Sequence, residues 1–300
     1  MKARYTTAEI LKAAHNIRKR MLRLALDRGG GYLGQACSSA EILSTLYMRV
    51  LNLGESLGSP EAAVFPGVPG PRNMDYPKGS LYNGPTTGGY DRFFLSPAHY
   101  AGVLYCVLAE CGRISRGAIE MINVDGWNME MIGAEHSPGF ENTAGSLGQT
   151  ISIAAGTAHA RKIKQETGRV VIFLSDGEIQ EGQVWECFQA MSFYHLDNIV
   201  IYIDVNGHQL EGLTKNVMDI EPLARRLEAF GAVAAEIDGH DVVALAAAAN
   251  TPHEGKALVV LCHTSCTRDI PFLEQREPYL HFVRFGKDEL AGVEAFYDKM

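Results

Sequence analysis

Residues 169–212 read RVVIFLSDGEIQEGQVWECFQAMSFYHLDNIVIYIDVNGHQLEG, and the pattern in this stretch decides the fold. Two short apolar, β-branched runs, at 170–174 and 198–203, each end in polar and glycine residues. Such runs are typical of buried parallel strands. Between them, residues from about 181 to 194 form an amphipathic segment that is long enough for a crossover helix. The stretch therefore predicts a strand–helix–strand unit in an α/β fold, with a parallel sheet flanked by helices.

Oxygen-bearing side chains follow both predicted strands. Asp176 comes after the first run and Asn206 after the second, and in open α/β sheets ligands bind beyond the carboxyl ends of the strands. A carboxylate, a carboxamide and a backbone carbonyl from the loop after Asn206 would suit Mg²⁺ or Ca²⁺. Because Mg²⁺ completes its shell with water and phosphate oxygens, a diphosphate is the expected co-ligand, and Gly177 would let the chain approach it closely. The alternative is that Asp176 and Asn206 only form turns.

Composition narrows the class of protein. The chain has 300 residues, of which 46% are hydrophobic and 21% charged, with a net charge of −8. These values are typical of a globular protein, and the negative charge argues against nucleic acid or an anionic membrane as partner. No signal peptide and no apolar run long enough to span a bilayer is visible in the sequence. The six cysteines are scattered and mostly lie in apolar segments, so a cytoplasmic location is expected.

The N-terminal region predicts two helices joined by a glycine-rich loop. Thr6 and Glu9 form a capping box, after which apolar residues recur at helical spacing up to the glycine run. Residues 29–34 predict a flexible active-site loop, since no strand precedes them as a dinucleotide-binding loop would require. Ser38 and Glu41 form a second capping box, which predicts that the next helix begins there.

The central stretch resembles the thiamine diphosphate motif of transketolases, in which GDG is followed, one strand–helix–strand unit later, by an Asn. Asp176 and Asn206 are thirty positions apart, and the intervening EIQEGQVWE and LDN and the following NGHQLEG are of the transketolase variety. The resemblance implies thiamine diphosphate and Mg²⁺ (or Ca²⁺) as cofactors. It also implies that the carbonyl of His208 is the third metal ligand. Ser175 stands where the family has the first glycine, so it would either crowd the diphosphate or donate a hydroxyl to it.

Two further motifs extend the resemblance, which covers about residues 8 to 285. DRFFLSPAH, ending at His99, resembles the family's DRFxLSxGH. It implies that His99 contacts the diphosphate or the substrate. HSPGFENTAGSLGQ, residues 136–149, resembles TPGVExxTGSLGQ. This second motif implies that three consecutive residues lie along the cofactor: Gly145, Ser146 and Leu147. His136 is aligned with a family His near the substrate.

The resemblance also assigns residues near the substrate and the partner. His281 is aligned with a family His of the substrate site, and Glu181 with a family Glu that lies near the partner. Tyr32 stands where the family has a substrate-contacting His. The helix expected at about 147–160 has no charged residue and several small ones, so we expect it to be buried in a subunit assembly.

The whole chain, residues 1–300, resembles a single diphosphate-binding domain, the N-terminal part of transketolase. Residues 54–90 are dense in Gly and Pro without any period, and most transketolases are shorter here. A long loop insertion is therefore expected, either as a lid or as a partner contact. In the family, the Glu that activates the aminopyrimidine ring lies on the following domain. The resemblance thus implies a partner subunit with the pyrimidine-binding and C-terminal domains, in an α₂β₂ assembly.

The activity implied is that of the N-terminal subunit of a split transketolase, active only with its partner. It would transfer a two-carbon ketol unit from a ketose, or ketose phosphate, to an aldose or aldehyde acceptor, with His99 and His281 as catalytic residues. One alternative is a transketolase-like carboligase of a specialised pathway, with an unusual donor or acceptor. The other is a catalytically degenerate subunit that only binds or scaffolds.

Overall fold

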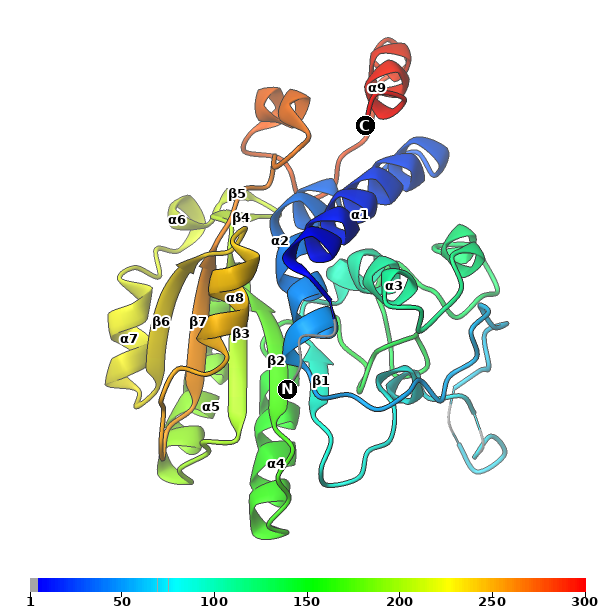
Figure 1. Cartoon of the computed structure of the whole chain (residues 1–300). Coiled ribbons are helices and arrows are strands. Elements are labelled where there is room, and N and C mark those ends of the chain that lie inside the picture. The colour runs from blue at the N-terminus through cyan, green and yellow to red at the C-terminus, as the bar shows by residue number, and fades with distance from the viewer. Residues whose placement is uncertain (1–4, 69, 75) are drawn as a thin grey trace.

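A five-stranded parallel sheet forms the centre of the computed structural model, which describes residues 5–68, 70–74 and 76–300 (Figure 1). In spatial order the strands are β1 (Arg92–Leu95), β2 (Val170–Ser175), β3 (Ile199–Val205), β7 (Leu258–His263) and β6 (Val233–Asp238). All four strand pairings are parallel. The predicted α/β fold with a parallel sheet is therefore confirmed. The sequence patterns of β1 and β6 were not recognised as strands.

The central unit agrees closely with its prediction. β2 and β3 pair in register from Val170 opposite Ile199 to Ser175 opposite Asp204, and α5 (Gly182–Phe193) connects them. Every residue of β2 is buried. Its continuous apolar run follows from this position, because helices cover both faces of the sheet.

Helices cover the sheet on both faces (Figure 1). On one face, α1 (Thr7–Asp27), α2 (Leu33–Thr45), α3 (Ala101–Glu110) and α8 (Val242–Ala248) pack on side chains such as Phe173 and Tyr202. On the other face, α4 (Thr150–Ile163), α5 and α7 (Leu223–Ala229) pack on side chains such as Ile172 and Ile201. Successive residues of β2 and β3 thus contribute to different cores, as the two-residue period of a strand requires.

Shorter elements complete the chain. A two-stranded antiparallel ribbon, β4 (His208–Gln209) and β5 (Gly212–Leu213), follows β3. The remaining helices are η1 (Leu46–Val50), η2 (Gly79–Asn83), η3 (Ala98–Tyr100), η4 (Gly117–Met121), η5 (Gly177–Gln180), α6 (Thr214–Val217), η6 (Pro271–Arg276) and α9 (Leu290–Tyr297).

The helix expected at about 147–160 is α4, which runs from Thr150 to Ile163 and includes Arg161 and Lys162. The predicted start of the second helix is wrong. The capping box of Thr6 and Glu9 is present at the start of α1, but α2 begins at Leu33, so Ser38 and Glu41 lie inside it. Ser38 Oγ donates a hydrogen bond to Asp204 (2.6 Å), and Glu41 accepts two from the buried Arg18 guanidinium. Both side chains make tertiary contacts that sequence spacing cannot distinguish from a capping box.

Most of the 54–90 segment is coil, and it packs against residues 113–141; positions 69 and 75 lie outside the described residues. The Gly79 N–H donates to Glu135 O (2.6 Å), and Gly79 O accepts from the Gly139 N–H (2.9 Å). The buried Arg113 guanidinium donates to the carbonyls of Tyr82 (2.8 Å) and Gly54 (3.0 Å). These bonds attach both ends of the segment to the rest of the protein.

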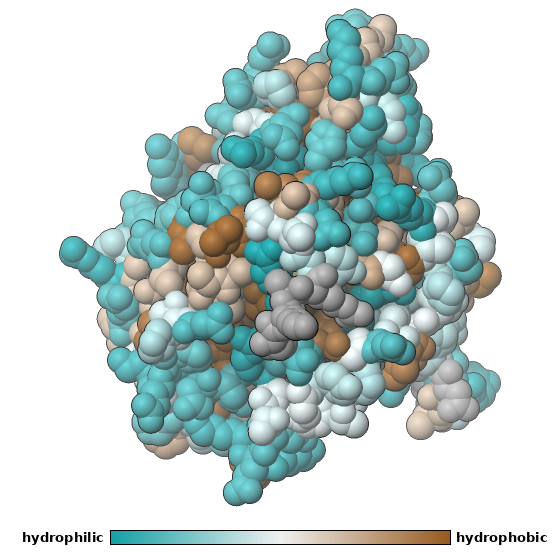
Figure 2. Space-filling view, viewed as in Figure 1, coloured by the Kyte–Doolittle hydropathy of each residue, from teal (hydrophilic) through white to brown (hydrophobic). Residues whose placement is uncertain are grey.

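The face of the molecule seen in Figure 2 is largely hydrophilic, with hydrophobic residues in small, separate groups. Over the ranges that the structure describes, no helix combines the length and the hydrophobicity needed to cross a membrane.

Replacing Gly79 tests the attachment of the 54–90 segment. A Cβ at this position would lie 1.9 Å from Ser137 O and 2.8 Å from Phe140 O. Because backbone atoms cannot move aside as a flexible side chain can, Gly79→Ala is expected to lower the free energy of unfolding by about 1–3 kcal/mol. Gly70→Ala is the matched control, since no atom lies within 4 Å of its Cβ. Urea unfolding midpoints compare the stability of Gly79→Ala with that of Gly70→Ala. Equal midpoints for the two variants would contradict the packing described.

Candidate functional site

A cavity of about 370 Å³ opens at the carboxyl-terminal edge of the sheet. Eight of the residues predicted from the sequence line it: His99, Gly145, Leu147, Ser175, Gly177, Glu181, His208 and His281. They come from segments that follow β1, β2 and β3, from the loop before α4, and from the region after η6. The residues that line it with them include Tyr32 and Gln35 from the start of α2.

Two predicted metal ligands line a neighbouring cavity, also of about 370 Å³. These are Asp176 and Asn206, and His208 borders both cavities. The Asp176 carboxylate is 2% exposed. It accepts hydrogen bonds from the N–H groups of Gly177 and Gly207, each at 2.8 Å. The carboxylate is thereby held at the point where the loops after β2 and β3 meet.

A second carboxylate, Asp204, is completely buried beside this point. It accepts hydrogen bonds from four side chains: Ser38, Thr264, Tyr100 (2.9 Å) and Asn206 (3.0 Å). Burial, together with the Asp204 charge, raises the pKa of Asp176 to about 7. The Asn206 amide nitrogen donates to Asp204. The Asn206 Oδ1 accepts a hydrogen bond from the His208 N–H (2.9 Å). Asp204 was missed in the sequence, although an acid inside an otherwise apolar strand was a usable signal.

Three rings form one wall of the cavity that His99 and His281 line. The centroids of His99 and His281 are 4.7 Å apart, and the Tyr32 ring lies 5.5 Å from the first and 5.4 Å from the second. Burial, with a smaller effect of His281, lowers the pKa of His99 to about 3. Burial also lowers the pKa of His281, against the opposing charge of Glu211. Both imidazoles are therefore neutral near pH 7, and each can donate or accept a hydrogen bond.

Glu178 is a further buried carboxylate that was missed in the sequence. It accepts hydrogen bonds from Ser96 Oγ and from the Gly148 N–H (2.8 Å), so it ties the loop after β1 and the segment before α4 to the end of β2. Burial raises its pKa to about 7. Its neighbour Glu181 was predicted and lines the cavity.

Two residues singled out in the sequence lie elsewhere. Ser146 is exposed and its Oγ accepts from the Gln149 amide (3.1 Å), whereas Gly145 and Leu147 on either side line the cavity. His136 bonds to Glu130 and stacks edge-on against Phe65 of the 54–90 segment. These contacts place the His136 ring against the insertion and not among the residues that line the cavity with His99.

The chemistry of the site suits a polar ligand that donates hydrogen bonds and a hard cation. Buried polar atoms normally have partners, yet four here have none within the described ranges: Gln35 Oε1, Glu178 Oε2, His208 Nε2 and Gln209 Oε1. The described residues contain no group of three or more His, Cys, Asp or Glu able to hold a metal. A cation at Asp176 would therefore need the carboxamide and carbonyl oxygens, and those donors suit Mg²⁺ or Ca²⁺.

Tyr100→Phe tests the network around Asp204. The change removes a donor to a buried carboxylate and a partner of the Asn206 amide (3.2 Å). A loss of about 1.5–3 kcal/mol in unfolding free energy is expected, as for a hydrogen bond to a charged group. Tyr202→Phe is the control, because this buried hydroxyl donates to a neutral carbonyl, that of Leu245 (2.9 Å), and should lose only about 0.5–1.5 kcal/mol. Denaturant unfolding measures the unfolding free energy of both variants. A larger loss of unfolding free energy in Tyr202→Phe than in Tyr100→Phe would refute the importance of the network.

Known proteins resemble this chain over almost its whole length. A transketolase family protein of Sinorhizobium fredii is 34% identical over 93% of this chain and 91% of its own. A protein of Actinobacillus succinogenes that is named as a subunit of apulose-4-phosphate transketolase is 30% identical, covering 97% of both chains. The 6-deoxy-6-sulfo-D-fructose transketolase subunit SqwG of a Clostridium species is 28% identical over 87% of this chain and 86% of its own.

The fold and a family model agree with these relatives. The transketolase of Campylobacter jejuni superposes with a TM-score of 0.76 at 20% identity, over 98% of this chain and 43% of that chain. This chain thus spans less than half the length of that enzyme. Residues 80–296 match the family model described as transketolase, thiamine diphosphate binding domain. The chain therefore belongs to the transketolase family and carries its thiamine diphosphate-binding domain.

Proposed function

We propose that this chain is the N-terminal subunit of a split transketolase that transfers a two-carbon ketol unit from a ketose, or ketose phosphate, to an aldose or aldehyde. One observation carries the proposal. His99 and His281 from distant parts of the sequence meet at one cavity, next to Asp176 and Asn206. A pair of neutral imidazoles beside a cation and diphosphate site is what a ketol transfer needs from this side of the cofactor.

The cofactor would be held at the carboxyl ends of β2 and β3. Asp176, Asn206 and the His208 carbonyl would ligate Mg²⁺ or Ca²⁺. Residues that line the cavity would contact thiamine diphosphate, namely His99, Gly145, Leu147, Ser175, Gly177 and Glu181. The adjacent Ser146 and its N–H, just before α4, would face phosphate.

The two histidines would act on substrate oxygens. Thiamine diphosphate, when bound, supplies a carbon nucleophile that accepts and releases a two-carbon unit. His99 and His281 would donate hydrogen bonds to carbonyl or hydroxyl oxygens of the substrate, which stabilises negative charge as it develops there. Neutral imidazoles suit this role, because they can donate a hydrogen bond without the cost of burying a charge.

The need for a partner is supported by two relatives. The proteins matched in Actinobacillus succinogenes and Phocaeicola vulgatus are each named as one subunit of an apulose-4-phosphate transketolase. This chain covers 97% of the first and 86% of the second. We infer that it works with a second subunit carrying the pyrimidine-binding and C-terminal domains, in an α₂β₂ enzyme of the cytoplasm.

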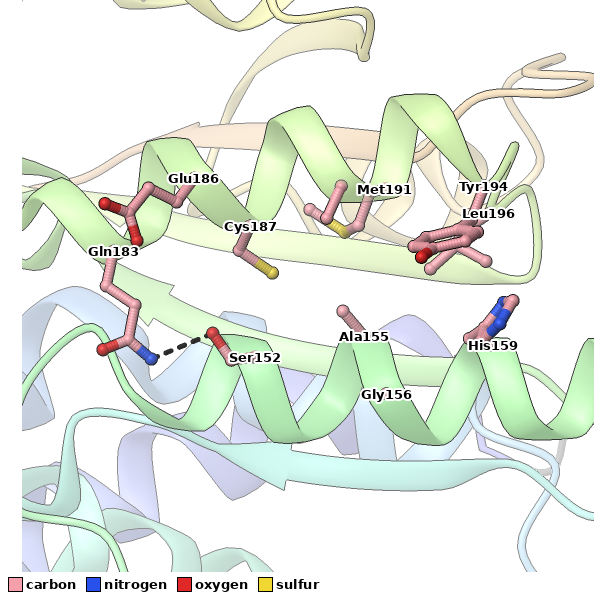
Figure 3. Close-up of a pocket in the computed structure, with 11 residues that line it drawn as sticks. Ser152, Ala155, Gly156, His159, Gln183, Glu186, Cys187, Met191, Tyr194 and Leu196 are labelled. Carbon is pink, nitrogen blue, oxygen red and sulfur yellow. Dashed lines mark hydrogen bonds between the residues drawn. The ribbon is translucent and has the colours of Figure 1, made fainter.

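The helices α4 and α5 offer a surface for that partner (Figure 3). A groove of about 360 Å³ runs between them, lined by small and apolar residues such as Ala155, Gly156 and Met191. The Gln183 amide donates to Ser152 Oγ (3.0 Å) at one end, and the rings of His159 and Tyr194 lie 4.4 Å apart at the other. The expected burial of this helix inside an assembly is consistent with the groove, because no atom lies within 4 Å of a Cβ placed on Gly156.

Exposed apolar side chains extend this surface beyond the groove. Ile153 and Ile163 of α4 are 46% and 70% exposed, and Phe193 of α5 is 75% exposed. Burying such side chains stabilises a complex by roughly 1.5–3 kcal/mol each when burial is complete. A partner that covers α4 and α5 would bring its own groups close to Glu181, which precedes α5.

Cofactor binding is expected to depend on pH. A cation binds the ionised carboxylate of Asp176, and the ionised fraction rises as pH passes the raised pKa of about 7. The affinity of the co-expressed pair for thiamine diphosphate with Mg²⁺ should therefore increase about tenfold from pH 6 to pH 8. Calorimetric titration measures it, and an affinity independent of pH would contradict the metal assignment.

The variant Asp176→Asn separates the metal site from general effects of charge. It should abolish Mg²⁺-dependent binding of thiamine diphosphate while the protein stays folded by circular dichroism. Asp125→Asn, at an exposed position, makes the same change in charge and should bind like the wild type.

The activity itself is tested with the co-expressed pair, a ketose phosphate donor and a panel of aldehydes. Products longer by two carbons are expected, and their profile separates general from specialised acceptors. If the pair bound no thiamine diphosphate at millimolar Mg²⁺, the proposal would be replaced by a scaffold role.

A further inference from the structure

We propose that Gln35 is a positioning residue that fixes His281 in the tautomer with its proton on Nε2, an inference that rests on the proposed function for its catalytic meaning. Gln35 lies in the first turn of α2 and is 5% exposed. Its amide nitrogen is 3.1 Å from His281 Nδ1. An amide nitrogen can only donate, so Nδ1 must accept, and a neutral imidazole that accepts at Nδ1 carries its proton on Nε2.

The backbone holds the two residues at this distance. Gly31 and Val283 exchange two hydrogen bonds, at 3.0 and 2.9 Å. Close contact continues at Gly34, where a Cβ would lie 2.6 Å from Leu280 O. The start of α2 and the segment around His281 are thus fixed against each other on both sides of the pair.

Neighbouring rings limit how the imidazole can turn. The Tyr32 ring meets His281 edge-on at 5.4 Å, and His99 lies 4.7 Å away at a tilt of 49°. These contacts restrict the plane of the ring, whereas the bond from Gln35 decides which edge carries the proton. Gln35 Oε1 is buried without a partner among the described residues. Replacing the amide should therefore act through His281 and not through a second protein contact.

The consequence is a hydrogen-bond donor at the cavity. Nε2 is the ring nitrogen that Gln35 does not contact, and His281 lines the cavity together with His99. The N–H at this position can donate to a carbonyl or hydroxyl oxygen of a sugar. The titratable groups facing His281 are Tyr32, His99 and Glu211. Gln35 adds no charge to this set, so the ring can stay neutral.

The tautomer can be measured directly on the folded chain. Two-bond ¹H–¹⁵N correlation spectra of ¹⁵N-histidine-labelled protein distinguish a protonated from an unprotonated ring nitrogen, and His281→Gln assigns the signals. We expect an unprotonated Nδ1 and a protonated Nε2 at pH 7. A proton on Nδ1, or a roughly equal mixture of tautomers, would overturn the proposal.

Three variants connect the tautomer to Gln35. Gln35→Met keeps the size of the side chain and removes the donor, so His281 should become a mixture of tautomers. Gln35→Glu places an acceptor and a negative charge at Nδ1, so the proton should move to Nδ1 and the pKa of His281 should rise. Gln165→Glu makes the same charge change at an exposed position and should leave the His281 signals unchanged. Unchanged signals in both folded Gln35 variants would refute the role.

Kinetics of the assembled enzyme then give the catalytic meaning. In Gln35→Glu, where the proton of the neutral His281 ring moves to Nδ1, loss of the Nε2 donor should lower kcat by about 10²-fold, at the low end of what a positioned acid or base contributes, with a smaller change in KM. In Gln35→Met, where both tautomers are present, kcat should fall only in proportion to the lost Nε2–H form. The acidic limb of the profile of kcat against pH should move to higher pH in Gln35→Glu and not in Gln165→Glu. Because the spectra need no cofactor or partner, they stay interpretable if the proposed function fails. If the spectra show the proton on Nδ1 in Gln35→Glu while kcat stays unchanged, the positioning role alone is overturned.

Discussion

The parallel pairing of β2 with β3 is the constraint on which the rest of the structure depends. Their register sets Ser175 opposite Asp204, and the Asp176 N–H donates to Asp204 O (3.1 Å), so both strands end at the same level. Because helices bury both faces of the sheet, a slip in register would move apolar side chains from one core to the other. The packing of the sheet therefore fixes the distance between the loops that carry Asp176 and Asn206.

Buried carboxylates at this edge join stability to function. Asp204 and Glu178 are completely enclosed, and Asp176 nearly so. Burying an ionised group is costly unless donors surround it, and here the donors come from α2, from η3 and from the loops after β1, β3 and β7. The same donors align the oxygens that would face a cation.

The substrate end of the cavity is assembled differently, from segments far apart in the sequence. The start of α2 brings Tyr32 and Gln35 against the region of His281, and His99 arrives from the loop after β1. By the resemblance, Tyr32 stands where the family has a histidine, so a phenol ring lies beside the imidazoles of His99 and His281.

The sequence by itself determined the central strand–helix–strand unit, the family and eight of the residues that line the cavity, because buried parallel strands have an apolar pattern and functional loops have fixed motifs at fixed spacing. It did not determine the edge strands β1 and β6 or the start of α2. The short β1 is hidden within a motif, β6 is only partly buried, and Ser38 with Glu41 imitates a capping box. Only the tertiary structure decided that Asp204 and Glu178 are buried beside Asp176 and that Gln35 meets His281. The physical reason is that these are contacts between residues distant in sequence, and local pattern carries no information about which distant donor or acceptor will complete a buried polar group.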